Sequence, residues 1–197
     1  MAKGDAWGDI FVTKVWLLIE GGGPEHLNIR FIDAFRTFLG LDRNFHIEMT
    51  GGYKETVNRF LEAPKQGQYK VMLIDSEGPL PPFTKEILPT DILRSWAQNH
   101  AKAFKIDRHG LNALEKSKFD QIHFMVQMME AWFIGDVENV EILSKEEIKS
   151  RIPQNNYSKK KAPEILKNLY SQIVRKKSIY CDRLLKKIEE LKDKKEV

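Results

Sequence analysis

The sequence contains one cysteine, Cys181, among its 197 residues. A single thiol excludes an intrachain disulfide framework and a cysteine-based zinc site, and it fits a reducing compartment. No apolar run approaches the roughly 20 residues that cross a membrane, and no long apolar segment follows the first lysine as it would in a signal peptide. We therefore expect a cytoplasmic protein with no membrane segment.

The composition is that of an ordinary globular protein, with 42% hydrophobic and 30% charged residues. The net charge of +4 is unevenly spread, because residues 158–197 carry 13 Lys or Arg against 6 Asp or Glu, which leaves −3 for the rest. We expect an α/β domain over residues 1–140 and a basic helical extension over residues 141–197 packed on it. The extension would contact a polyanion or simply be a solvated lysine-rich helix.

Short apolar runs alternate with helical patterns along the first two thirds of the chain. Strands are predicted at residues 14–19, 45–49, 71–74 and 122–126. A first helical stripe is formed by Leu27, Phe31, Ala34, Phe35 and Phe38. A second is formed by Tyr53, Val57, Phe60 and Leu61. This alternation predicts an α/β fold with a central, mostly parallel sheet flanked by helices.

The remainder is predicted to be loops and short helices. The proline-rich residues 77–89 are expected to form a surface loop, and a helix should start directly after the fourth strand. Pro153 and Pro163 are expected to break the helices that follow, because proline lacks the N–H that a helix interior needs. A charged helix is predicted from about Ile179 to Lys195, so the C-terminal piece should be helical.

Acidic residues occupy the carboxyl ends of the predicted strands. Glu20 ends the first strand, Asp75 and Glu77 end the third, and Glu130 lies shortly after the fourth. Ligands of open parallel sheets bind outside these ends, and carboxylates without a histidine–cysteine set suit Mg²⁺ or Mn²⁺ better than zinc. Asp75 and Glu77 are two residues apart, so on a strand both side chains would point the same way.

The segment IEGGG contains more glycine than a simple turn needs. Gly21, Gly22 and Gly23 would let the main chain pass close to a phosphate and would leave Glu20 open to a metal or substrate. The same residues would equally form a flexible turn that Glu20 caps. The segment IDSE, at the matching end of another strand, favours the interpretation as a site.

Five sequence blocks together resemble a known family. LLIEGGG followed by VMLIDSEGP resembles the TOPRIM fold, in which one strand ends in Glu-Gly and a later strand ends in Asp-x-Asp. With GGYKETVNRF, HFMVQMMEAWF and the late YSKK and CDRLL, residues 14–185 resemble a bacterial TOPRIM-like family, domain of unknown function 4276. The resemblance implies a metal-dependent nuclease of DNA or RNA. The alternative is a non-catalytic TOPRIM-like module that regulates an ATPase complex.

The resemblance also implies residue roles and partners. Glu20 matches the TOPRIM glutamate, a general acid/base or metal ligand, and Asp75 and Glu77 match the two metal-binding acids. Glu77 departs from the usual aspartate by one methylene. Members of the family are often encoded beside ABC-type ATPases, as in phage-defence systems. This layout implies an ABC/SMC-type ATPase partner, an anti-phage effector role, and paired subunits around that partner.

Further residues are candidates for substrate contact. Gln127 lies at the end of the fourth strand, and Tyr157, Lys159 and Lys160 in YSKKK would grip phosphates. A solvated loop is an equal alternative for YSKKK. The chain lacks the GxxxxGK[ST] motif, so it should not itself be an ATPase. A transferase of primase type is a third functional class.

Other polar and aromatic residues are better explained by the core. His123 is expected to be a core histidine that bonds to the backbone, rather than a metal ligand. Trp96 and Trp132 are expected to be core residues rather than platforms for stacked bases. The basic residues near the C-terminus are the part of the chain that would meet nucleic acid.

Overall fold

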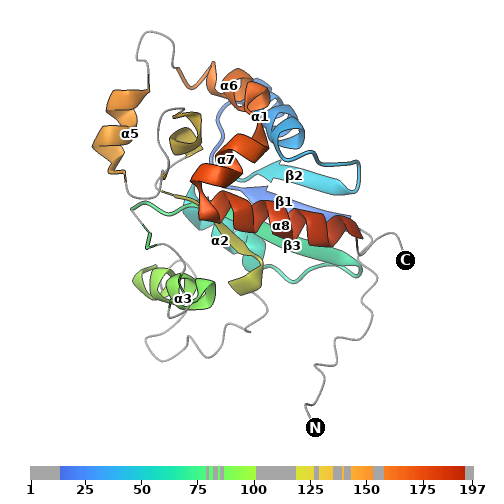
Figure 1. Cartoon of the computed structure of the whole chain (residues 1–197). Helices are drawn as coiled ribbons and strands as arrows, with labels where there is room; N and C mark the ends of the chain where they lie inside the picture. The colour runs from blue at the N-terminus through green and yellow to red at the C-terminus, as the bar shows by residue number, and fades with distance from the viewer. Residues whose placement is uncertain are drawn as a thin grey trace.

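A four-stranded parallel sheet forms the centre of the computed structural model (Figure 1). The structure describes residues 14–78, 80–81, 84, 87–100, 119–126, 129–134, 139, 143–152 and 158–193. The strands are β1 (Lys14–Ile19), β2 (Phe45–Met49), β3 (Gln68–Asp75) and β4 (Ile122–Met125). They lie in the order β2-β1-β3-β4, and each neighbouring pair is parallel. The predicted α/β class is confirmed, and the arrangement is consistent with a TOPRIM-like fold.

The two central strands are buried on both faces. Val15, Leu17 and Ile19 of β1 belong to one core cluster, and Leu18 belongs to the other. Continuous apolar runs are typical of parallel strands that helices cover on both sides. β3 begins earlier than its apolar run suggested, because Gln68 pairs with Lys14 at the start of the β1–β3 ladder.

Helices cover both faces of the sheet. α1 (Glu25–Phe38) contributes the predicted stripe to the first core, and all five of its members are buried. α2 (Tyr53–Leu61) and α3 (Pro89–Asn99) contribute to the second core. In Figure 1, α8 (Ile179–Asp193) crosses in front of the strands while α2 lies behind them.

The C-terminal helices share the first core with the sheet. α6 (Ala162–Asn168), α7 (Ser171–Lys177) and α8 bury Leu166, Val174 and Leu184 in the cluster that also holds Val15 and Phe31. α6 runs beside α1, where Lys167 Nζ lies 2.6 Å from Asp33 Oδ2. α5 (Lys145–Arg151) belongs to a third, smaller cluster.

Two helix predictions need correction. Pro163 does not break a helix: it occupies the first turn of α6, where a missing N–H costs no hydrogen bond. The helix expected after β4 is a 3-10 helix of five residues, η2 (Met129–Phe133). The C-terminal helix was predicted correctly at its start, and it is described as far as Asp193.

The helices are short by the standard of membrane proteins. Within the described ranges, none combines the length and apolar character that a membrane span needs. α8 is the longest of those described, at 15 residues, and eight of these residues are charged.

Candidate active site

The carboxyl ends of β1 and β3 meet at the point where the chain changes direction across the sheet. After β1 the chain crosses to β2 on one side, and after β3 it proceeds to β4 on the other side. In open α/β sheets, ligands bind in the crevice at such a switch point, because the two connections diverge there and leave space between them. Glu20 and Asp75 are the residues at these two ends.

Glu20 is bonded directly to the end of β3. Its main-chain N–H donates to the carbonyl of Leu73 at 2.9 Å, which continues the parallel ladder by one rung. The next rung would join the N–H of Asp75 to the main-chain carbonyl of Glu20. The Glu20 carboxylate takes its place, because Oε2 accepts the N–H of Asp75 at 3.0 Å. The structure therefore brings Glu20 and Asp75 together, and it also gives Glu20 a structural role.

Asp75 is the last residue of β3 and is partly exposed. Its Oδ1 atom is buried. The strand that carries it is fixed between β1 and β4, where Asp75 pairs with Met125. Asp75 is thus a carboxylate on a rigid element, with one oxygen turned away from bulk solvent.

Glu77 does not lie on a strand, so the strand geometry on which its alignment with Asp75 was predicted does not hold. β3 ends at Asp75, and Glu77 has a φ of 60°, in the left-handed region. A side chain in that region costs free energy that the surrounding structure must offset. Glu77 is exposed and lines a cavity on the α3 side of the sheet.

The glycines after β1 have a structural explanation. Gly21 has a φ of 111° and forms a reciprocal bridge with Gly51, with N–H to carbonyl distances of 2.6 and 2.9 Å. Gly22 has a φ of 132°, and a Cβ added there would lie 2.9 Å from Asn28 Oδ1. That same oxygen accepts the N–H of Gly23 at 2.8 Å. Contact with a phosphate stays a prediction for these three residues.

The loop after β2 completes this edge of the sheet, and sequence reasoning gave its threonines no role. The Oγ1 atom of Thr50 donates to the Ile19 carbonyl at 2.9 Å and lies 2.6 Å from Thr56 Oγ1. Thr56 is buried and donates to the Gly52 carbonyl at 3.1 Å. These hydroxyls tie the ends of β1 and β2 to the first turn of α2. The only sequence signal for this role was the run Thr50-Gly51-Gly52 after the second strand.

Two helices begin at the same edge. α1 starts after Pro24 and α2 starts after Gly52, and no described side chain caps either start. Free N–H groups and the helix dipole make such ends electropositive. They would partly balance the negative charge of Glu20 and Asp75 and would favour an anionic ligand nearby.

The other predicted site residues are placed as follows. Glu130 is half-buried in η2, and Lys159 and Lys160 are exposed in the turn before α6. Gln127 and Tyr157 lie outside the described residues. Because α6 runs beside α1, the two lysines lie on the α1 side of the molecule.

No metal-binding group of three or more His, Cys, Asp or Glu side chains occurs among the described residues. Glu20, Asp75, Glu77 and Glu130 are all described, so they are not gathered into one ligand set. The pair that is gathered is Glu20 with Asp75. Comparisons with family models, curated proteins and solved structures gave no match. The family resemblance therefore stays a prediction.

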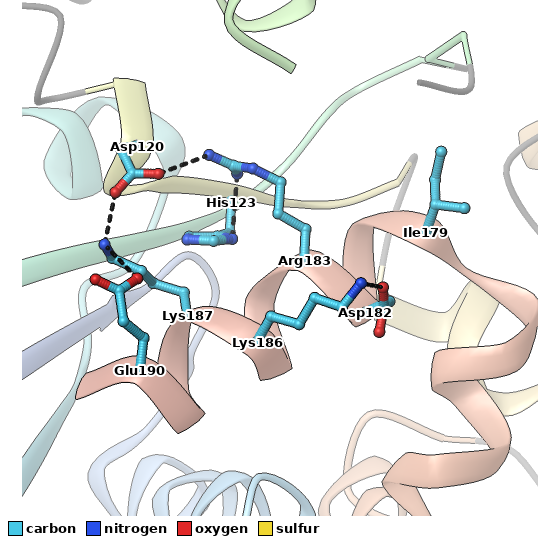
Figure 2. Close-up of a pocket in the computed structure, with 8 residues that line it drawn as sticks. All are labelled: Asp120, His123, Ile179, Asp182, Arg183, Lys186, Lys187 and Glu190. Atoms are coloured by element: carbon cyan, nitrogen blue, oxygen red, sulfur yellow. Dashed lines mark hydrogen bonds and ion pairs between the residues drawn. The ribbon is translucent and has the colours of Figure 1, made fainter. Parts of the chain in front are cut away.

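A second polar cluster lies at the amino end of β4 (Figure 2). Arg183 of α8 donates to the carbonyls of Ile122 at 2.5 Å and Phe119 at 3.1 Å, and it lies 3.2 Å from His123 Nδ1. Lys187 bonds to Asp120 at 2.5 Å, which raises the lysine pKa although its burial opposes the charge. This cluster attaches α8 to β4.

His123 lies inside this cluster as a core histidine. Only 1% of its surface is exposed. Burial, and then the charges of Arg183 and Lys187, holds its pKa well below the usual range, so the ring is neutral at pH 7. His123 is paired with Leu73 in the sheet, two residues before Asp75, and its ring contacts Arg183 of α8, which agrees with a structural role.

Proposed function

We propose that the protein is a metal-dependent nuclease that cleaves phosphodiester bonds in DNA or RNA. The observation that carries the proposal is the hydrogen bond from the main-chain N–H of Asp75 to the Glu20 carboxylate, which places two acidic residues side by side at the ends of adjacent parallel strands, at the switch point of the sheet. Their charge favours a divalent cation, and the electropositive starts of α1 and α2 at the same edge favour a phosphate.

The donor set fits Mg²⁺ or Mn²⁺. Mg²⁺ is commonly held by one or two carboxylates, with waters and substrate phosphates completing its shell. Glu20 and Asp75 would supply two hard oxygen ligands, and Glu130 or Glu77 would join only after a rearrangement. A bound cation would lower the pKa of an attacking water and neutralise charge on the scissile phosphate.

The protein residues have separate tasks in this proposal. Glu20 stays attached to the end of β3 through the Asp75 N–H, which fixes its carboxylate. Gly21 and Gly22 carry no side chain that could cover that carboxylate, so substrate would be able to reach it. Lys159 and Lys160, exposed beside α1, would contact substrate phosphates and position the strand rather than cut it.

The partner and setting belong to the same proposal. An ABC/SMC-type ATPase would regulate the nuclease within an anti-phage defence system, as the family resemblance implies. Nothing in the chain supplies nucleotide hydrolysis by itself, because it has no GxxxxGK[ST] motif. Regulation by a partner would keep a nuclease inactive until it is needed.

The decisive experiment is a cleavage assay with the purified full chain. Single-stranded and double-stranded DNA and RNA are incubated with Mg²⁺, Mn²⁺ or EDTA. We expect cleavage that requires the cation and that is lost in Asp75→Asn, which removes a charge at nearly constant volume. Asp193→Asn, an exposed acid at the end of α8, is the matched control. Equal cleavage by Asp75→Asn and the wild type would refute the proposal.

A second candidate function has one specific observation in its favour. The Glu20 carboxylate already bonds to a main-chain N–H, so its presence has a structural reason that requires no metal. A non-catalytic module that binds a partner ATPase would need no more than this. Calorimetric titration with Mn²⁺ separates the two, because the module would release no binding heat that depends on Asp75.

A further inference from the structure

A cavity of about 550 Å³ lies beside the end of β3, on the α3 side of the sheet. Ser76 and Glu77, which directly follow Asp75, form part of its wall, and α3 forms another part. Its volume falls in the range of pockets that hold small molecules, roughly 300–1,000 Å³. Two residues span at most about 7 Å, so the cavity adjoins the candidate active site.

α3 presents two rows of side chains to this cavity. Residues four apart on a helix lie one above the other on the same face. The polar row consists of Asp91, Ser95 and Asn99. The apolar and aromatic row consists of Ile92, Trp96 and His100. A ligand in the cavity would therefore meet the edge of a largely buried apolar row, capped by the His100 ring, and a line of hydrogen-bonding groups beside it.

The aromatic part of the wall is held rigidly. The rings of Trp96 and His100 are stacked with centroids 4.4 Å apart and planes inclined by 24°. Trp96 Nε1 donates to the carbonyl of Ser76 at 3.3 Å, and the ring of Tyr53 meets His100 edge-on at 5.8 Å. Ile87, 39% exposed, adds apolar surface. A wall of this kind is preorganised for a planar ring.

The charges of the described residues around the cavity disfavour a phosphate as its main occupant. Among the described residues that line it, none is a lysine or an arginine, whereas Glu77 and Asp91 are acids. Carboxylates and the Asn99 amide accept hydrogen bonds from ring N–H and amino groups. A nucleobase combines such donors with a flat apolar face, and its phosphates would lie outside the cavity.

We infer that this cavity holds a nucleobase of the nucleic-acid substrate, next to the phosphate at Glu20 and Asp75. The inference rests on the proposed function for the class of ligand. The base packs against His100 and Ile87, with Trp96, a core residue as expected and 5% exposed, supporting the His100 ring from behind. Ser95 and Asn99 bond to the polar edge of the base. A base enters such a cavity only when it is unpaired, so the preferred substrate is single-stranded or locally opened.

The test measures binding of nucleosides to the full chain by calorimetry, in EDTA and without cleavage. Ser95→Phe fills the cavity from an exposed position of α3, and Gln98→Phe, exposed on the same helix but outside the cavity, is the matched control. We expect wild type and Gln98→Phe to bind at least one nucleoside, and Ser95→Phe to bind it at least about tenfold more weakly, as loss of base stacking does. Circular dichroism checks that both variants fold.

Each outcome has one meaning for the inference. Equal binding by Ser95→Phe and Gln98→Phe, or no nucleoside binding by the wild type, overturns it. Binding of N-acetyltryptophanamide in place of nucleosides also overturns it and points to a peptide side chain of a protein partner. Nucleoside binding by a protein that cleaves no nucleic acid supports the cavity and refutes the nuclease. The experiments therefore distinguish a cavity that binds no nucleobase from a protein that is not a nuclease.

Discussion

Replacing Glu20 separates its structural role from its proposed role in metal binding. In Glu20→Ala, the N–H of Asp75 loses the carboxylate that accepts it at 3.0 Å. In Glu20→Gln, an amide oxygen can accept the same N–H, but the negative charge is gone. Both variants therefore lose the negative charge, but only Glu20→Ala loses the hydrogen bond.

The magnitude follows from the partly buried position of this bond. A hydrogen bond to a charged group contributes about 1.5–3 kcal/mol, and a neutral one contributes about 0.5–1.5 kcal/mol. Glu20 is partly exposed, which favours the lower ends. We expect Glu20→Ala to lower the free energy of unfolding by about 2 kcal/mol and Glu20→Gln by less than about 1 kcal/mol. For a chain of this length, about 2 kcal/mol corresponds to a Tm lower by roughly 4–8 °C.

The assay is urea unfolding followed by tryptophan fluorescence, in EDTA and again with Mn²⁺. A cation that binds only the folded wild type would add about 1.4 kcal/mol at ten times its Kd. We expect Glu20→Gln to lose that gain while it keeps most of the stability measured in EDTA. Glu25→Ala, an exposed acid in the first turn of α1, is the control for a general charge effect.

Two results would refute this reasoning. If Glu20→Ala unfolds at the same urea concentration as the wild type in EDTA, the bond to Asp75 has no structural value. If Glu20→Gln keeps the full stabilisation by Mn²⁺, Glu20 is not a ligand. The first result would remove the main observation behind the non-catalytic alternative. The second would weaken the proposal that the protein is a nuclease.

Three further predictions concern other parts of the chain. The pKa of His123 is lowered in the folded state, so the free energy of unfolding should fall as the pH drops below about 6.5, by up to about 1.4 kcal/mol per pH unit. His123→Gln should flatten this pH dependence, as measured by urea titrations. Gly22→Ala should cost about 1–2 kcal/mol in the same measurement, whereas Gly52→Ala, with open space around it, should cost less, because only the preference of the α2 N-cap for glycine over alanine opposes it. Changing Lys159, Lys160 and Lys161 to Gln should lower the salt slope of DNA binding by up to about 3; an unchanged slope would contradict the proposed phosphate contacts.

Much of the sheet could be predicted from the sequence because its strands are short apolar runs with clear ends. The predicted bounds of β1 and β2 match the structure, since a glycine pair or triplet follows each strand within two residues. β3 was predicted too short, because polar Gln68 pairs through its main chain and leaves no hydrophobic signal. Pro163 was misread because proline marks a helix start as well as a break.

Only the part of the site that depends on where the parallel strands end could be predicted from the sequence. Parallel strands end at one edge, so the meeting of Glu20 and Asp75 needed only their places at two strand ends. Glu77 was misplaced because nothing in its residue type signals a left-handed φ. The cavity beside α3 depends on how a helix packs near the end of a distant strand, and no local pattern encodes that contact.

The attachments of α8 have a consequence for how the protein is made on the ribosome. Tyr180 donates to the carbonyl of Pro81, Arg183 donates to that of Ile122, and Lys192 donates to that of Gly40, which was synthesised 152 residues earlier. At about 5–20 residues per second, these carbonyls wait roughly 3–30 s for their donors. Until α8 emerges, β4 and the loop at Pro81 lack these bonds. The nascent chain would thus complete the attachment of β4 and of the loop at Pro81 only after α8 has been synthesised.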